Sequence, residues 1–498
     1  MNFLGKNHIG YQVSNLGSQV FYGFDPQLNQ PLETPFHQAS SDEIELALEK
    51  AQAAFKIFRV LPLKKRIEFF QEIRRQIQLN SSDLIEWYCK ETALPKSRAE
   101  GELNRTIYQF EYYLESIQNG YVQARKTNDC QLEQGTNQVS LTKWNIPIGP
   151  VLVFGASNFP FAYGTLGGDV ASALIAGCPV IVKAHPMHPH TSSISAQIIV
   201  NAAQITQMPD GVFSHLLADD NHVAEKLVKD ERIQAVGFTG SISGGNAILK
   251  LIQQRSVPIP IYAEMGSSNP IIVFYDALKK NKLEIARKIA DSVKASAGQF
   301  CTSPGLVFLQ KSEIARDFTE LLKEEFKQIA PQFMLHPRIF ENYQKRASEQ
   351  FQKTDVLFRG YCGNGQISPS LVRINAEVFL KDSSIQEEIF GSFLTLVICE
   401  NDEQLNKCIH QLKGQLTISV FTEDEKHLHE LFFDLAEKCG RLIFNGVPTG
   451  VEVSVAQQHG GPFPSSSSYF SSVGWDAVMR FVRPISVQNI SSNTIGII

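Results

Sequence analysis

The sequence predicts an α/β protein built on a parallel β-sheet. Between residues 149 and 265, short apolar runs rich in β-branched residues alternate with helical stretches. The runs are PVLVFG, PVIVK, VFSHLL, IQAVGF and IPIYAEM. This alternation is typical of βαβ units, whose strands pair in parallel. It returns less cleanly from Pro270 through LTISVFT to RLIFNG, and predicts a second α/β domain.

The chain before the sheet is predicted to be helical, beginning at Ser40. Ser40 and Glu43 have the spacing of a capping box, in which two side chains satisfy free N–H groups at a helix start. Apolar residues then recur at helical spacing, at Ile44, Ala47, Leu48, Ala51 and Phe55, and again at Ile67, Phe70, Ile73 and Ile77. We therefore expect helices over the first hundred residues.

The composition is typical of a globular protein with two or three domains. The chain has 498 residues, of which 43% are hydrophobic and 19% are charged, so sizeable cores can form. Its 46 basic and 51 acidic residues are scattered along the chain, and the formal net charge is -5. We expect no nucleic-acid partner, because no basic block is present.

The eight cysteines indicate a reducing compartment. They form no CxxC pair and no Cys/His cluster with zinc spacing, and they are too few for a disulfide scaffold. The first residues, MNFLGKNHIG, contain no signal-peptide core. Residues 146–182 carry one charge over a membrane-spanning length, but many glycines and prolines interrupt them. We expect a cytoplasmic protein without a metal or a membrane span, and a buried strand, loop and helix at 146–182.

Cys301 is the candidate nucleophile. The segment GQFCTSP places it after an amphipathic helix and before the apolar strand GLVFL, in a turn rather than in a core strand. Most cysteines are small buried hydrophobic residues, so its neighbours have to decide its role. A thiol that attacks a carbonyl needs donors for the oxyanion, a base for a second step and, if oxidation follows, a hydride acceptor.

Two residues at predicted strand ends could supply the donor and the base. Asn158 carries an uncharged N–H₂ that could act with the main-chain N–H of Cys301, although an Asx-type turn is the alternative. Glu264 is the only carboxylate between Glu231 and Asp276. Its place at the end of an apolar strand predicts a raised pKa suited to activating water. The alternative for Glu264 is an ordinary ion pair at the strand end.

The segment TGSISGG is similar to a phosphate-binding turn. Gly240, Gly244 and Gly245 allow close backbone approach, and Ser241 offers a hydroxyl at a helix N-terminus. The chain has no GxGxxG fingerprint and no GxxxxGK loop, so neither the usual dinucleotide motif nor a P-loop is supported.

Six motifs together resemble the aldehyde dehydrogenases, and the resemblance covers almost the whole chain. They are, in order, FGASNFP, VIVKAHP, GFTGS, AEMG, GQFC and EEIFG. Further segments are similar to the 2,5-dioxovalerate (α-ketoglutarate semialdehyde) dehydrogenase branch and to the NADP-dependent fatty-aldehyde dehydrogenase of luminous bacteria. These segments are YAEMGSSNP, HPMHPHT, GVPTGVEV, HGGPFPSSS and RFVRP.

The resemblance implies that an aldehyde is oxidised to a carboxylate through a cysteine thioester, with a nicotinamide cofactor. Cys301 would be the nucleophile, Asn158 and the Cys301 main-chain N–H would hold the oxyanion, and Glu264 would be the base. The cofactor-binding residues would be Lys183 at the adenosine ribose, Gly240 and Ser241 at the pyrophosphate, and Glu388 and Phe390 at the nicotinamide, with Ser157, His185, Pro186 and Gly245 beside them.

Two departures from the family pattern affect the cofactor site. NAD-preferring members usually carry Glu three residues after the lysine, where this chain has Pro186. With no carboxylate there to repel a 2′-phosphate, and with Lys183, His185 and His188 nearby, the cofactor is expected to be NADP or NAD, with NADP tolerated. Ser392 stands where the family usually has Pro, which should alter the loop without removing Glu388.

The resemblance also implies three structural parts. They are a Rossmann-type cofactor domain (1–130 and 145–263), an α/β catalytic domain (264–481) and a small β oligomerisation arm (131–144 and 482–498). The arm segments have strand-like alternation and little to pack on within themselves. We therefore expect a homodimer or homotetramer.

The sequence is compatible with two classes of aldehyde substrate. A dioxovalerate enzyme needs a cation at the far end of its tunnel, and Arg105 is the candidate, with a surface pair to Glu102 as the alternative. In a medium- or long-chain (fatty) aldehyde dehydrogenase, an apolar tunnel would be lined by Phe161, Tyr163, Phe300 and Phe463, although aromatic residues are more often core.

Two other classes of protein are alternatives to an aldehyde dehydrogenase. A cofactor-free cysteine hydrolase needs a histidine beside the thiol, and the only one within 35 residues of Cys301 is His336. A non-catalytic binding protein of the same fold predicts the loss of Cys301, Glu264 or Asn158, and all three are present.

Overall fold

The first of two large sheets has five parallel strands, as the alternation at 149–265 predicts. The computed structural model describes residues 3–131 and 138–489. The strand order is β11 (Ile261–Glu264), β10 (Ala235–Thr239), β7 (Val151–Phe154), β8 (Val180–Lys183), β9 (Phe213–Leu216), β1 (Asn7–Ile9) and β2 (Gln12–Ser14). The antiparallel strands β1 and β2 extend the edge beyond β9. The expectation of helices over the first hundred residues is therefore wrong for residues 7–37, where the structure has strands. Strands of three residues, such as β1 and β2, are too short to give a periodic pattern.

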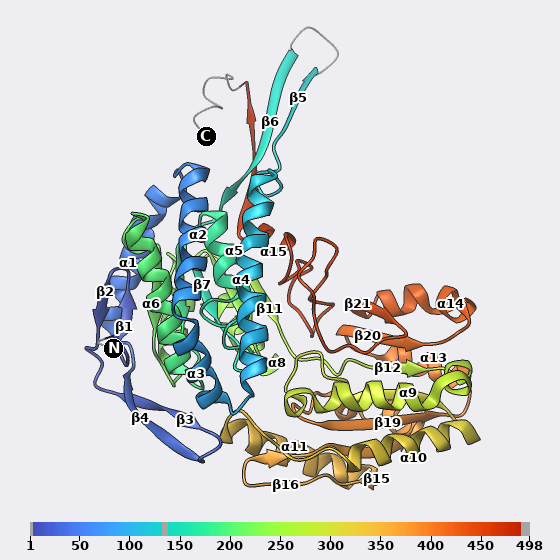
Figure 1. Cartoon of the computed structure of the whole chain (residues 1–498). Helices are drawn as coiled ribbons and strands as arrows, with labels where there is room; N and C mark the ends of the chain where they lie inside the picture. Colours follow the sequence, from blue (N-terminus) through green and yellow to red (C-terminus); the bar gives the residue numbers. More distant parts are fainter. Residues whose placement is uncertain (1–2, 132–137, 490–498) are drawn as a thin grey trace.

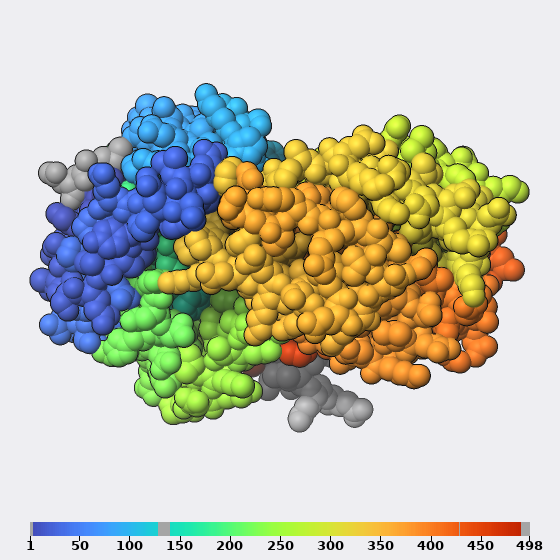
Figure 2. All heavy atoms as spheres, turned by 90° about the horizontal axis from the view of Figure 1, so that it is seen from below, coloured from blue at the N-terminus to red at the C-terminus, as the bar shows by residue number. Residues whose placement is uncertain are grey.

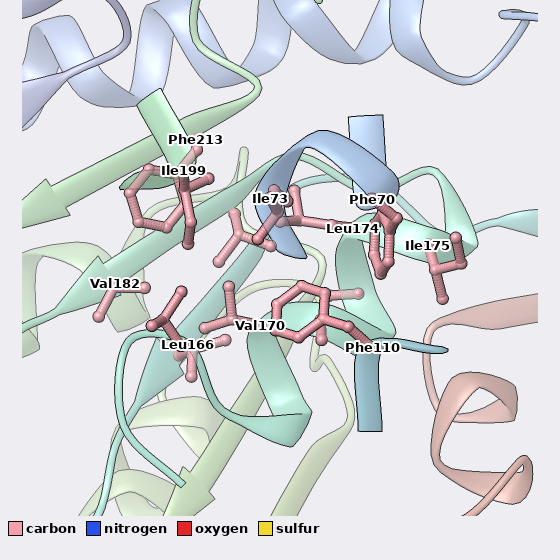
Figure 3. Close-up of a cluster of buried hydrophobic side chains, with 14 of the residues drawn as sticks. Phe70, Ile73, Phe110, Leu166, Val170, Leu174, Ile175, Val182, Ile199 and Phe213 are labelled. Atoms are coloured by element: carbon pink, nitrogen blue, oxygen red, sulfur yellow. The ribbon is translucent and has the colours of Figure 1, made fainter. Parts of the chain in front are cut away.

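Helices cover both faces of this sheet. One face carries α1 (Ser41–Phe58), α7 (His222–Lys229) and α8 (Ile242–Gln253). The other carries α2 (Leu63–Leu79), α3 (Ser81–Thr92), α4 (Lys96–Gln118), α5 (Gly168–Ala176) and α6 (Pro189–Ile205). Side chains of β7 alternate between the two cores, because successive strand residues point to opposite faces. Figure 3 shows the larger of these cores, where helices α2 and α4 pack against α5.

The expected local signals at 40–58 and 146–182 are confirmed. Ser40 and Glu43 form the capping box of α1, with both hydrogen bonds present. Residues 146–182 include the buried strand β7, a loop, the buried helix α5 and the start of β8. Within residues 3–131 and 138–489, no helix is both long and apolar enough to cross a membrane.

The second large sheet forms the other lobe. Its order is β15 (Asp355–Phe358), β18 (Ser370–Asn375), β19 (Phe393–Cys399), β13 (Leu306–Gln310), β12 (Ile271–Val273), β20 (Gln415–Phe421) and β21 (Cys439–Phe444). All pairings are parallel except that of β15 with β18. Helices α9 (Tyr275–Lys294) and α10 (Glu313–Lys327) cover one face, and α12 (Ala376–Lys381), α13 (Asp402–Gln411) and α14 (Glu425–Ala436) cover the other.

A narrow three-stranded antiparallel sheet projects away from both lobes (Figure 1). It consists of β5 (Lys126–Gln131), β6 (Gln138–Pro147) and β22 (Val482–Gln488). These strands begin before the expected arm boundary at residue 131 and end after the one at 144. The parts of the expected arm at 132–137 and 490–498 lie outside the described residues. A further hairpin, β3 (Val20–Asp25) with β4 (Gln30–His37), packs near α3.

A cavity of about 1100 Å³ lies between the two lobes. The loops that follow β7, β8 and β10 line it on one side, and helix α11 (Pro337–Lys353) and the segment 386–390 line it on the other. Figure 2 shows the two lobes side by side with a hollow between them. The ligand-binding edge of the first sheet therefore faces the second lobe, as expected for the carboxyl ends of parallel strands.

Candidate active site

Cys301 lies in a turn whose backbone is unusual. The preceding short helix η1 (Ala295–Gly298) holds three consecutive left-handed residues, Ser296, Ala297 and Gly298, with φ of 49°, 55° and 71°. A side chain at Gly298 would bring its Cβ to 2.3 Å from the carbonyl carbon of Gly391, so only glycine fits there. The turn carries Cys301 from the end of α9 to the edge of the cavity.

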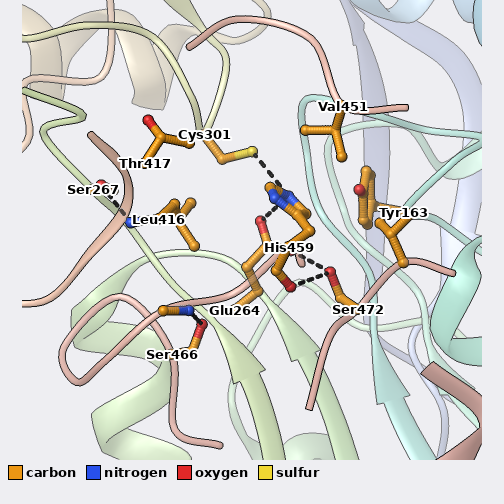
Figure 4. Close-up of polar contacts among 12 residues, drawn as sticks. Tyr163, Glu264, Ser267, Cys301, Leu416, Thr417, Val451, His459, Ser466 and Ser472 are labelled. Carbon is orange, nitrogen blue, oxygen red and sulfur yellow. Dashed lines mark hydrogen bonds and ion pairs between the residues drawn. The ribbon is translucent and has the colours of Figure 1, made fainter. Parts of the chain in front are cut away.

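The thiol of Cys301 has a histidine beside it that the sequence analysis missed. The Sγ atom lies 3.8 Å from Nε2 of His459. The same Nε2 lies 3.0 Å from Oε1 of Glu264, at the end of β11. Ser472 donates a hydrogen bond of 2.8 Å to Oε2 of Glu264. Figure 4 shows the imidazole between the thiol and the carboxylate.

The chain separation of 158 residues explains why the search around Cys301 found only His336. His336 instead caps the start of α11, where its Nδ1 accepts the N–H of Arg338. His459 begins the segment HGGPFPSSS, which resembles the dioxovalerate branch, and this resemblance is the one sequence signal for it. The N–H of His459 donates to the hydroxyl oxygen of Ser471, and the N–H of Ser472 donates to the carbonyl of His459, which holds this segment against the site.

The charges in this cluster differ from the expectation for Glu264. Burial raises the pKa of the Cys301 thiol well above its ordinary value, and the carboxylates of Glu264 and Glu388 raise it further. Burial also acts to raise the pKa of Glu264, but the charge and hydrogen bond of His459 and the hydroxyl of Ser472 outweigh it. The pKa of Glu264 is therefore lowered, and the predicted raised value is wrong. The sequence could not place an imidazole and a hydroxyl beside this carboxylate.

These three side chains could also hold a metal ion. The ligand atoms of Glu264, Cys301 and His459 all lie within 4.8 Å of one another. The sequence search for zinc spacing could not find this group, since its members come from three distant segments.

Asn158 faces the same cavity as Cys301 and Glu264. Its Nδ2 donates a hydrogen bond of 2.9 Å to the carbonyl of Gln299, two residues before the thiol. The loop that carries Asn158 is held by the buried carboxylate of Glu102, whose Oε1 accepts the N–H groups of Phe161 and Ala162 at 2.9 and 3.0 Å. The amide is therefore fixed next to the thiol from two sides.

The residues implied for the cofactor mostly gather along the cavity. Ser157, His185, Gly240, Ser241, Glu388 and Phe390 line it. Ser241 caps α8 by accepting the N–H of Gly244 at 3.1 Å. A side chain at Gly245 would place its Cβ 2.4 Å from Sδ of Met265, so this glycine allows α8 to pack against β11. Burial raises the pKa of Glu388 to about 8.

The structure places carboxylates near Lys183, which the sequence did not predict. Lys183 ends β8, and burial lowers its pKa to about 8 although Asp219 and Asp220 act to raise it. A carboxylate is therefore near the lysine even though Pro186 supplies none. Arg338 of α11 neutralises Asp219 with two hydrogen bonds of 2.7 and 2.8 Å. Burial holds the pKa of His185 well below its ordinary value, so this side chain adds no positive charge.

Arg105 and Phe161, two of the candidate substrate residues, are held by contacts within the protein. Arg105 does not form the surface pair with Glu102; it donates to Tyr163 at 3.3 Å, and to Gln109 and the carbonyl of Val451 at 3.4 Å. Phe161 is fully buried against the ring of Tyr88 in the core, so it does not face the cavity.

The remaining aromatic candidates stay near the site. Phe300 packs edge-to-face on Phe159, with ring centroids 5.1 Å apart. Tyr163 lies 6.1 Å from the His459 ring. Phe463 lines the cavity with 62% of its surface exposed.

Comparison with known proteins gives the family of the chain. A model of the aldehyde dehydrogenase family matches residues 17–483. The chain belongs to this family. It is 36% identical, over 98% of this chain and 95% of the other, to alpha-ketoglutaric semialdehyde dehydrogenase 2 of Azospirillum brasilense. It is 37% identical, over 98% and 94%, to alpha-ketoglutaric semialdehyde dehydrogenase of Acinetobacter baylyi.

Solved structures agree with the fold of an aldehyde dehydrogenase. A 1-pyrroline-5-carboxylate dehydrogenase from Thermus with bound NAD superposes with a TM-score of 0.84 at 20% identity, covering 97% of this chain and 92% of that one. The resemblance stated from the motifs is confirmed, and so is the α/β fold. The protein is an NAD(P)-dependent oxidoreductase that acts on aldehydes.

The contact between His459 and Cys301 predicts how fast the thiol of this aldehyde dehydrogenase reacts without any cofactor. His459→Gln removes the imidazole but leaves the Glu264 carboxylate, which raises the pKa of the thiol, so we expect iodoacetamide to alkylate Cys301 at least about tenfold more slowly at neutral pH. The rate is measured by mass spectrometry of the Cys301 peptide, with a chelator present to remove bound metal. The exposed Cys362 in the same sample is the internal control. Equal Cys301 rates in both proteins would contradict the role of His459.

The pKa of Glu388, about 8, predicts a pH-dependent stability. Because the folded carboxyl keeps its proton where the unfolded one has lost it, its contribution is full below the unfolded pKa, which is about 4.3, and is lost as pH rises through about 8. Glu388→Gln removes this dependence. The difference in unfolding temperature, variant minus wild type, should therefore grow between pH 5 and 8 and then level off. A difference that stays constant with pH would show that the carboxyl titrates normally.

Proposed function

We propose that this aldehyde dehydrogenase oxidises 2,5-dioxopentanoate, the semialdehyde of α-ketoglutarate, to 2-oxoglutarate through a thioester on Cys301. The observation that carries the mechanism is the cluster in which Nε2 of His459 lies 3.8 Å from the thiol and 3.0 Å from Glu264. The two relatives at 36 and 37% identity support the substrate, since both are named for this semialdehyde.

In the first step the neutral form of His459 takes the thiol proton of Cys301, because a thiol with a raised pKa is a poor nucleophile until a base removes its proton. The imidazolium that results is the charge that lowers the pKa of Glu264. The thiolate adds to the aldehyde carbon and forms the C–S bond. The carbonyl electron pair moves to oxygen, and the amide N–H of Asn158 and the main-chain N–H of Cys301 stabilise this oxyanion.

Bound NAD(P) supplies the hydride acceptor for the oxidation. The residues present fit such a cofactor: Ser241 starts a helix at the cavity, and Gly245 lets that helix pack closely, so a pyrophosphate would meet free N–H groups. Lys183 would hold the adenosine ribose, and Glu388 and Phe390 would hold the nicotinamide end. Re-formation of the carbonyl leaves a thioester on Cys301.

In the last step Glu264 activates water. Its lowered pKa keeps the carboxylate ionised at neutral pH, so it is able to accept a proton. Water oxygen bonds to the acyl carbon, the C–S bond breaks, and the sulfur leaves as thiolate. His459 can then share the proton between the carboxylate and the thiolate, because one nitrogen faces both.

We propose that the enzyme accepts both NADP and NAD. The pairing of Arg338 with Asp219 supports tolerance of a 2′-phosphate, because it neutralises one of the two carboxylates that act on Lys183. We also propose a cytoplasmic location. The seven cysteines that the structure describes at side-chain level are free thiols, which supports this location.

Initial-rate kinetics on a small aldehyde panel with both cofactors test the substrate. We expect kcat/KM for dioxopentanoate to exceed that for decanal by more than about tenfold, since a site that binds the substrate carboxylate discriminates against an alkyl chain that lacks one. Cys301→Ala is the control and should lose reduction of the cofactor. The reverse preference would support the medium- or long-chain alternative, to which Phe159 and Phe300 could contribute an apolar wall.

A cysteine hydrolase is the second candidate, because the structure supplies the histidine that this class needs. Hydrolysis of a thioester or ester without cofactor, together with no cofactor reduction by any aldehyde, would favour it. The non-catalytic binding protein has no such support, since Cys301, Glu264 and Asn158 face one cavity.

We also propose that the arm joins two or more subunits. Its outer strands β5 and β22 flank β6 and project from both lobes, so their outer edges have free hydrogen-bonding groups to offer. Sedimentation should give a dimer or tetramer. Replacing residues 127–142 by a short turn should give a monomer, and a wild-type monomer would overturn the proposal.

A further inference from the structure

Arg98, in the first turn of α4, forms only part of the contacts that a guanidinium can make. Its Nη1 lies 3.0 Å from Oε2 of Glu102, one turn further along the helix. The side chain of Glu102 is fully buried, and that of Arg98 is 20% exposed. Glu102 also accepts a hydrogen bond of 2.7 Å from Tyr88. The carboxylate therefore anchors one corner of the guanidinium and leaves the rest free.

The other edge of Arg98 finds no acceptor. Its Nε and Nη2 atoms are buried and have no hydrogen-bond partner among the residues that the structure describes. A buried donor without an acceptor costs about 1–3 kcal/mol, more when it is charged. These two N–H groups point the same way from the planar group and match the two oxygens of a carboxylate.

The same edge binds carboxylates elsewhere in this chain. Arg75 donates from Nε and Nη2 to the two oxygens of Glu72 at 2.8 and 2.6 Å. Arg232 does so to Asp230 at 2.8 and 2.7 Å. The pair of Arg75 is exposed and that of Arg232 is partly buried, so this edge binds carboxylates in both settings. The corresponding edge of Arg98 is buried and has no carboxylate among the residues that the structure describes.

Two aromatic rings connect Arg98 to the reacting residues. Its guanidinium carbon lies 4.4 Å from the ring centre of Phe159 and 5.1 Å from that of Phe300. Phe159 follows Asn158 in the chain, and Phe300 precedes Cys301. One layer of side chains therefore separates the free edge from the nucleophile and the oxyanion donor.

Arg105 is placed differently, although it lies on the same helix two turns later. Its guanidinium already donates to three acceptors, on Tyr163, Gln109 and Val451. It also faces the ring of Tyr163 at 5.4 Å. Arg105 is therefore largely engaged by the protein itself, and its positive charge adds to the field around the free edge of Arg98.

We propose that the Nε/Nη2 edge of Arg98 binds the carboxylate of the substrate while its aldehyde end reacts at Cys301. This inference rests on the proposed function and names the residue that selects its substrate class, a short-chain ω-oxo acid. The aliphatic part of such a substrate lies along Phe159 and Phe300. A long alkyl aldehyde has no group that satisfies the buried N–H pair, so it is disfavoured.

The test compares 5-oxopentanoate with pentanal, which has the same chain length and no carboxylate. Arg98→Lys keeps the positive charge beside Glu102 but loses the two-pronged edge. We expect the ratio of kcat/KM for the acid over pentanal to fall at least about thirtyfold, mainly through the KM for the acid. Arg98→Gln should lower it at least as far. Arg75→Lys, at the exposed fork of α2, is the matched control and should leave the ratio unchanged.

Binding without turnover gives a second measurement. Glutarate resembles the acid product and should slow alkylation of Cys301 in the wild type. It should fail to do so in Arg98→Lys, whose unfolding temperature is recorded alongside to show that the chain folds. Protection equal to that of the wild type would overturn the assignment of Arg98.

The outcomes separate the two proposals. A wild type that does not prefer 5-oxopentanoate to pentanal refutes the proposed substrate class. A wild type with this preference, combined with an Arg98→Lys variant that keeps it and an Arg105→Gln variant that loses it, overturns Arg98 and leaves the proposed function intact.

Discussion

The arrangement of the active site depends on the contact of one imidazole with both a thiol and a carboxylate. Glu264 ends a strand of the first sheet, Cys301 precedes a strand of the second, and His459 comes from the segment after β21. Burying the carboxylate is tolerable only because a histidine and a serine stabilise its charge. This contact therefore joins residues of both lobes beside the cavity that lies between them.

Glu102 organises the opposite wall in a comparable way. Its buried carboxylate accepts the N–H groups that follow Asn158, the hydroxyl of Tyr88 and one corner of Arg98. One carboxylate therefore positions both the oxyanion donor and the cation that we assign to the substrate. These contacts use only one corner of Arg98, which leaves its Nε and Nη2 atoms able to bind a ligand.

The sequence predicted best what depends on local pattern. The strands β7 to β11 and the cap at Ser40 follow from short-range periodicity and spacing, and the structure has them. Cys301, Glu264 and Asn158 lie at strand ends or turns, where the topology of a parallel sheet brings loops to one edge, and they do face one cavity. The short strands β1 and β2 carry no such periodicity.

The sequence could not predict side-chain contacts between residues that are far apart in the chain. His459 is 158 residues from the thiol it contacts, and Arg338 reaches Asp219 from the other lobe. The same reason explains the error about Glu264, because its pKa depends on the imidazole beside it rather than on its strand. It also explains why the sequence did not point to Arg98, since only the contacts of a guanidinium show whether it has donors without acceptors.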